Sequence, residues 1–63
     1  MGYRIKEIRE ERKMSQQELV RKSGVSRGTI SALENGTMRA TTTKTLVAIA
    51  DALEVTVDQI FLT

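Results

Sequence analysis

Apolar residues recur at helical spacing along the chain. Ile5 and Ile8 lie three positions apart, and Arg9 and Arg12 continue the same face, which predicts a helix over residues 3–13. The most regular face has four apolar side chains at i, i+3, i+4 and i+7: Leu46, Ile49, Ala50 and Leu53. Because helical spacing continues to the C-terminal end, we predict an all-α fold.

Capping patterns divide the chain into separate helices. Ser15 is followed three residues later by Glu18, which predicts a capping box in which each residue bonds the backbone of the other. The helix that follows has Leu19 and Val20 as its apolar residues and stops at Gly24, where a left-handed backbone is tolerated.

A third helix is predicted over about residues 26–35. Ser26 is its N-cap, Ile30 and Leu33 form its buried side, and Gly36 follows its end. This helix is separated from the second one by a very short turn.

The remaining residues predict a loop and two further helices. The fourth helix covers about residues 43–53. Thr56 and Gln59 form a second capping-box pattern, which opens a short fifth helix containing Ile60 and Phe61. We therefore expect residues 1–63 to form a single five-helix domain.

Charge is distributed unevenly along the chain, although the net charge is only +2. All ten Lys and Arg residues lie at or before Lys44, and with five carboxylates they give residues 1–44 a charge of +5. Residues 45–63 hold three carboxylates and no basic residue, a charge of −3. This asymmetry favours an anionic partner for one face, with a solvated mixed-charge surface as the alternative.

The composition argues against several classes of chemistry. Because the chain has no Cys and no His, it cannot build a disulfide, a thiolate nucleophile, a His-based hydrolase triad or the usual zinc site. No apolar run reaches the length of about 20 residues that a membrane span needs, and no signal peptide is recognisable. We expect an intracellular protein that is not an enzyme and has no metal, no cofactor, no small-molecule ligand and no membrane contact.

The turn Ser23-Gly24-Val25-Ser26 is the most informative feature. A turn of three or four residues containing Gly holds two helices at a steep angle, so that the second helix protrudes. With Ile30 and Leu33 buried, the outward face of that helix consists of small or hydrogen-bonding residues and one cation: Arg27, Gly28, Ser31, Ala32 and Asn35. Such a face suits close insertion into a groove.

The two helices and their turn form one continuous pattern: Gln16-x-x-Leu19-Val20-x-x-x-Gly24-Val25-Ser26-x-x-x-Ile30-Ser31-x-x-Glu34-Asn35-Gly36. This pattern closely resembles the helix-turn-helix of the phage repressor and Cro-type family, often called the XRE family, whose docking on DNA is a standard example of the motif. The resemblance runs from Arg4 to Phe61. It implies a compact five-helix, lambda-repressor-like DNA-binding domain with the helix-turn-helix in helices 2 and 3.

The resemblance also implies a role for individual residues. The recognition helix enters the major groove with Arg27 reading a base, most simply through guanine O6 and N7. The start of the second helix lies against a phosphate. The full set of expected DNA-binding residues is Ser15, Gln16, Ser26, Arg27, Gly28, Thr29, Ser31, Ala32, Asn35 and Arg39.

Other positions carry structural expectations. Arg9 and Glu34 match the family pair that links the first helix to the end of the third. Glu54 departs from the family, since Gly often closes the fourth helix there. The apolar residues least needed by the core make a candidate dimer interface: Val47, Val57 and Leu62.

The resemblance implies a sequence-specific regulator of transcription, most simply a repressor, that binds a palindromic operator on double-stranded DNA as a homodimer. It further implies a cytoplasmic, nucleoid-associated protein encoded by a bacterium or phage. The alternative is a protein-interaction module of the same fold, such as an antitoxin or a transcription cofactor.

Overall fold

Apolar side chains from all five helices meet in one core. The computed structural model describes residues 2–37 and 41–62. Within them the helices are α1 (Ile5–Glu11), α2 (Gln16–Ser23), α3 (Arg27–Asn35), α4 (Thr43–Leu53) and α5 (Val57–Ile60). The largest fully buried side chains are Ile5, Leu19, Ile30, Leu33, Ile49, Leu53 and Ile60.

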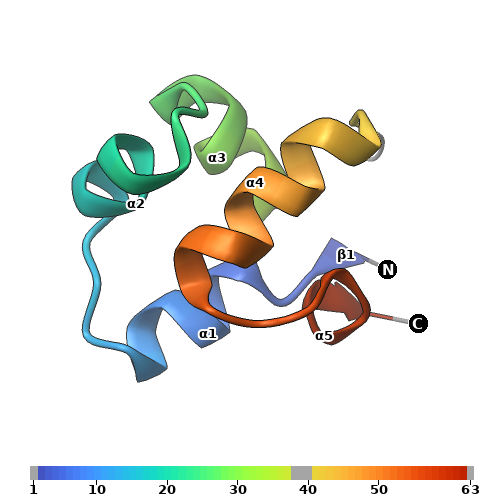
Figure 1. The fold of residues 1–63 in the computed structure, drawn as a ribbon. Helices are drawn as coiled ribbons and strands as arrows, with labels where there is room; N and C mark the ends of the chain where they lie inside the picture. Colours follow the sequence, from blue (N-terminus) through green and yellow to red (C-terminus); the bar gives the residue numbers. More distant parts are fainter. Residues whose placement is uncertain (1, 38–40, 63) are drawn as a thin grey trace.

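Helix α4 is the centre of the packing. It is drawn in yellow to orange across the middle of Figure 1, with α2 and α3 on one side and α1 and α5 near its C-terminal half. Its buried side is the one predicted from spacing, namely Leu46, Ile49, Ala50 and Leu53. The all-α, five-helix fold expected from the sequence is therefore the fold observed.

The chain ends form a feature that the hydrophobic pattern did not predict. β1 (Gly2–Tyr3) pairs antiparallel with β2 (Phe61–Leu62), with Tyr3 opposite Phe61. The amide of Arg4 also donates to the carbonyl of Ile60 at 2.7 Å, and the rings of Tyr3 and Phe61 lie 5.5 Å apart. The two ends of the chain are thereby held together, as Figure 1 shows.

This pairing corrects two of the predicted helix boundaries. The first helix begins at Ile5 instead of residue 3, because residues 2–3 bond to the opposite end of the chain. Phe61 belongs to β2 instead of the fifth helix, and its side chain is 41% exposed. Strands of two residues are too short to show an alternating pattern, so no sequence signal predicts them.

The first helix is also shorter than predicted at its C-terminal end. It ends at Glu11, with Arg12 as the C-cap and Lys13 in a left-handed conformation at φ 56°. Arg12 is therefore exposed instead of continuing the buried face of Arg9. Met14, which follows this turn, is buried in the core.

The caps form largely as predicted. Ser15 accepts a bond from the Glu18 amide, but the Glu18 carboxylate lies 3.6 Å from the Lys22 ammonium, so only half of that predicted capping box forms. The box of Thr56 and Gln59 is complete. No helix in the described ranges is long and apolar enough to cross a membrane.

Candidate nucleic-acid interface

The turn between α2 and α3 is fixed by local hydrogen bonds. Gly24 ends α2 with a left-handed φ of 75°, and its amide donates to the carbonyl of Val20. Ser26 then caps α3 by accepting from the Thr29 amide, while its hydroxyl donates to the Thr29 hydroxyl at 2.9 Å. Because hydrogen bonds hold the chain on both sides of the turn, the angle between the two helices is well defined.

A buried ionic network fixes α3 against α1 and α2. The Nε atom of Arg9 donates to Glu34 Oε2 at 2.8 Å, and Gln16 Nε2 donates to Glu34 Oε1 at 2.9 Å. A further guanidinium nitrogen of Arg9 donates to the carbonyl of Met14 at 2.7 Å. The network therefore joins three helices to the loop that precedes α2.

The environment of Arg9 keeps it charged. Its hydrogen bond to Glu34 is the main cause that raises the pKa of Arg9 above its ordinary value, against the opposing effect of burial. The two side chains are only 11% and 2% exposed. A buried charge needs such a partner, so this pair is a structural connection between α1 and the end of α3.

The outward side of α3 is only partly as predicted. Arg27, Gly28 and Asn35 are exposed, whereas Ser31 and Ala32 are half-buried. These two residues lie nearer to the neighbouring elements than helical spacing alone indicated. The helix is therefore accessible at both ends, through Arg27 and Gly28 at its start and Asn35 at its end.

Gly28 has no structural need to be glycine. It lies in the first turn of α3 without a positive φ, and a Cβ added there would meet nothing within 4 Å. Glycine in a helix costs about 0.5–1 kcal/mol relative to alanine. The packing of the described residues thus does not account for this glycine.

The polar residues predicted at the interface are already bonded to one another. Asn35 donates from its amide to the Ser31 hydroxyl at 3.3 Å. The side chain of Gln16 is half-buried and faces Glu34, so its amide is committed to the network instead of pointing freely outward. Thr29 is likewise half-buried and bonded to Ser26.

The other predicted positions are distributed as follows. Arg39 lies outside the described residues. Val47 is 40% exposed, whereas Val57 is half-buried and packs against the core. The backbone of Leu62 is in β2, but its side chain is outside the description.

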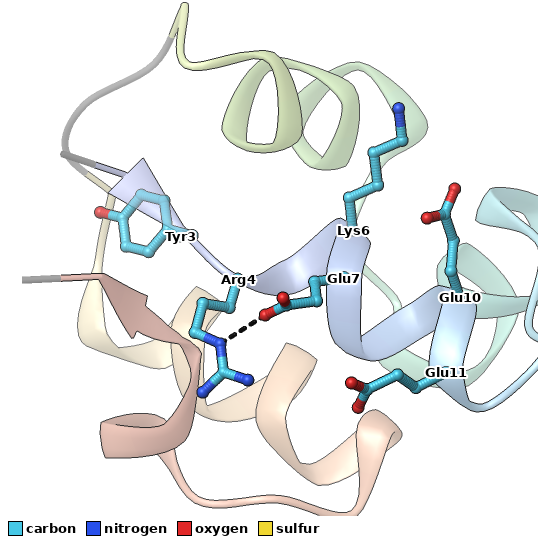
Figure 2. Close-up of a pocket in the computed structure, with 6 residues that line it drawn as sticks. All are labelled: Tyr3, Arg4, Lys6, Glu7, Glu10 and Glu11. Carbon is cyan, nitrogen blue, oxygen red and sulfur yellow. Dashed lines mark hydrogen bonds and ion pairs between the residues drawn. The ribbon is translucent and has the colours of Figure 1, made fainter.

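An open hollow lies beside α1, away from the turn. Figure 2 shows six residues lining it: Tyr3, Arg4, Lys6, Glu7, Glu10 and Glu11. Arg4 and Glu7 form an exposed ion pair there at 2.6 Å. Its three carboxylates outnumber its two cations, so this hollow offers a phosphate backbone no net positive charge. The α2–α3 side, with the exposed Arg27, is therefore the better candidate for nucleic acid.

Comparison with known families identifies this arrangement. A family model described as Helix-turn-helix matches residues 5–60, nearly the whole chain. The chain belongs to the XRE and Cro-type helix-turn-helix family. A search of curated proteins gave no match.

The family to which the chain belongs indicates the function of this geometry. In a helix-turn-helix protein the second helix of the motif lies in the major groove, with its N-terminal residues toward the bases. Here that helix is α3, and its first turn exposes Arg27 and Gly28. The chain is thus a DNA-binding helix-turn-helix regulator with a lambda-repressor-like fold.

The network around Glu34 was only partly foreseeable. Arg9 and Glu34 are 25 residues apart, and their pairing came from the family resemblance. Two further bonds had no sequence signal: the one from Gln16 to Glu34 and the one from Arg9 to the carbonyl of Met14. Both depend on how α1 and α2 are placed relative to each other.

Proposed function

We propose that this regulator is a transcriptional repressor that binds a palindromic operator as a homodimer. The observation that carries the proposal is the contrast between the two sides of α3. Its inner side is anchored through Ile30, Leu33 and Glu34, and its N-terminal turn exposes Arg27 and Gly28. A rigid helix with an accessible first turn suits direct reading of bases.

Arg27 is the residue we assign to base reading. It is the first residue of α3 and is exposed, and within the described residues its side chain has no ion-pair or hydrogen-bond partner. A guanidinium can donate two bonds to O6 and N7 of one guanine, which distinguishes that base from the other three. Arg27 would therefore fix the identity of one base pair in each half-site.

Phosphate contacts would come from the N-terminal ends of α2 and α3. Ser15 and Ser26 are exposed at these ends, where unpaired amides and the helix dipole favour an anion. Each serine already caps its helix, so the role in DNA contact is an additional one. Because Gln16 is bonded to Glu34, it would contribute by orienting the start of α2.

The homodimer follows from the amount of sequence that one helix can read. A single recognition helix contacts only a few base pairs, too few to define a site. Two copies related by a twofold axis would read half-sites about 34 Å apart, one turn of DNA. Occupation of such a site would block transcription by excluding the polymerase from an overlapping promoter.

Selection of bound sites from random duplexes, at two salt concentrations, tests the proposal. We expect an enriched palindrome and an affinity that falls steeply with salt, because counterions are released from the phosphates. A promoter carrying the selected site should then be less active when the protein is present.

Three results would contradict all or part of the proposal. The first is the absence of any enriched sequence together with an affinity that does not depend on salt. The second is an enriched site without twofold symmetry, which would contradict the dimer but not the binding of specific DNA. Failure to bind DNA combined with a tight complex with a protein encoded beside it would favour the interaction-module alternative.

A further inference from the structure

The exposed side of α4 carries a charged and apolar stripe that the proposed DNA contacts do not use. Lys44, Val47 and Asp51 are all exposed, at positions i, i+3 and i+7 of the helix. Val47 is one of the two large hydrophobic residues exposed in the described chain. The core lies on the opposite side of α4.

The two charges of this stripe have no partner within one molecule. Among the described residues, neither Lys44 nor Asp51 makes an ion pair or a side-chain hydrogen bond. Seven residues of helix separate them by about 10 Å along the axis, too far for a direct contact.

Their positions are also unfavourable for α4 taken alone. Lys44 lies in the first turn, at the positive end of the helix dipole, and Asp51 lies in the last turn, at the negative end. Exchanging the two charges would suit the isolated helix better. The observed order therefore needs a different explanation from helix stability.

We propose that α4 packs antiparallel against α4 of a second copy of this chain, with Lys44 of each copy paired to Asp51 of the other. A twofold axis that passes between positions 47 and 48 brings Lys44 of each copy opposite Asp51 of the other. The same axis places Val47 next to Val47 of the second copy, beside the small Ala48. The stripe is thus complementary to itself, as a twofold interface requires.

This inference rests on the homodimer of the proposed function and names its contact. One helix pair covers less than the roughly 800 Å² per partner of a standard stable interface. The contact is therefore weak in isolation and strengthened when DNA holds two copies close together. Val47 belongs to this contact, whereas Val57 is half-buried at the edge of the core.

Cysteine cross-linking tests the axis directly. The chain has no cysteine, so Val47→Cys introduces a single thiol. A disulfide needs Cβ atoms about 3.5–4.5 Å apart. Because the proposed axis passes beside position 47, it brings the two thiols toward each other. We expect Val47→Cys to cross-link at least about tenfold faster than the control Glu10→Cys, an exposed position on α1. Equal rates for the two variants would overturn the proposal.

Charge exchange provides an independent test. Lys44→Asp and Asp51→Lys should each weaken self-association about tenfold or more, because like charges then face each other, and the double exchange should restore it. Both substitutions suit the dipole of α4, so unfolding would not explain the loss. Lys6→Asp, at the second position of α1, is the matched control for charge and should have little effect.

Sedimentation of the full chain without DNA is the measurement for these variants, at protein concentrations high enough for the unmodified chain to form its weak dimer. Weaker self-association in both single variants, with recovery in the double variant, supports the proposal. A double variant that stays monomeric would overturn it. So would self-association that neither single variant nor the double variant changes. Sedimentation measures self-association independently of DNA binding. A failed operator selection would therefore contradict the proposed function without changing the sedimentation result.

Discussion

Arg9 in α1 and Glu34 in α3 form an ion pair that is buried beneath the helix-turn-helix, with 2.8 Å between Nε and Oε2. Glu34 is also bonded to Gln16 at the start of α2. One carboxylate therefore sets the positions of both helices of the motif relative to α1, although it touches no exposed part of the interface.

Replacing Glu34 should be among the most destabilising single changes. Glu34→Ala leaves the buried guanidinium of Arg9 without its counter-charge, which we expect to lower the free energy of unfolding by about 3–5 kcal/mol. Urea unfolding followed by circular dichroism measures this. The double variant Arg9→Met, Glu34→Leu should recover part of the loss, since no unpaired charge remains.

The exposed pair of Arg4 and Glu7 is the control for that prediction. Arg4→Ala removes an ion pair at 2.6 Å that is open to solvent, and the unfolding midpoint should hardly move. If Glu34→Ala behaved like Arg4→Ala, the buried pair would have no special role in stability.

Glu54→Gly should stabilise the protein. Glu54 closes α4 with a left-handed backbone at φ 61°, which costs a residue with a Cβ roughly 1 kcal/mol. Glycine removes that strain, so we expect a gain of up to about 1 kcal/mol in thermal or urea unfolding. Gly36→Ala, at φ 79° after α3, should have the opposite effect although its surroundings are open.

Arg27→Ala should weaken specific DNA binding more than non-specific binding. We expect a cost of about 1–3 kcal/mol on the selected operator and relaxed preference at one base position in each half-site. Titration of operator and random duplexes at one salt concentration gives the ratio of the affinity for the operator to the affinity for random DNA. Arg21→Ala, an exposed arginine at the end of α2, is the control. An unchanged ratio for Arg27→Ala would show that Arg27 contacts no base.

Gly28→Ala should change stability and DNA affinity in opposite directions. The added methyl group meets no protein atom within 4 Å, and alanine favours the helix by about 0.5–1 kcal/mol. In the complex, however, the methyl group would lie where α3 approaches the DNA most closely. Unfolding and operator titration measured on one preparation check both effects. Unchanged operator affinity would mean that the DNA does not approach Gly28 closely.

Local signals predicted most of the helices correctly. Ser26, Thr56 and the residues that follow them cap their helices through contacts within three positions, so the sequence contains everything that such a cap requires. Glu18 is the exception. Its carboxylate can reach either its own N-cap or Lys22, and the prediction chose the wrong alternative.

Features that join distant segments were harder to predict. The strands β1 and β2 form only because the two chain ends meet across the core, and the exposure of Phe61 follows from that pairing. Ser31 and Ala32 were predicted to face outward from helical spacing. They are half-buried because neighbouring elements cover part of this face of α3. The spacing of residues within one helix carries no information about such neighbours.

The sequence by itself determined the number of helices, most of their limits, the turn at Gly24 and the family to which the chain belongs, because these depend on spacing and capping within a few residues. The tertiary structure alone decided how Gln16, Arg9 and the carbonyl of Met14 converge with Glu34. It also decided which residues of α3 stay accessible and, within the part of the chain that the structure describes, left the charges of Lys44 and Asp51 without ion-pair partners. These properties depend on the relative placement of whole helices, which is fixed only when the core packs.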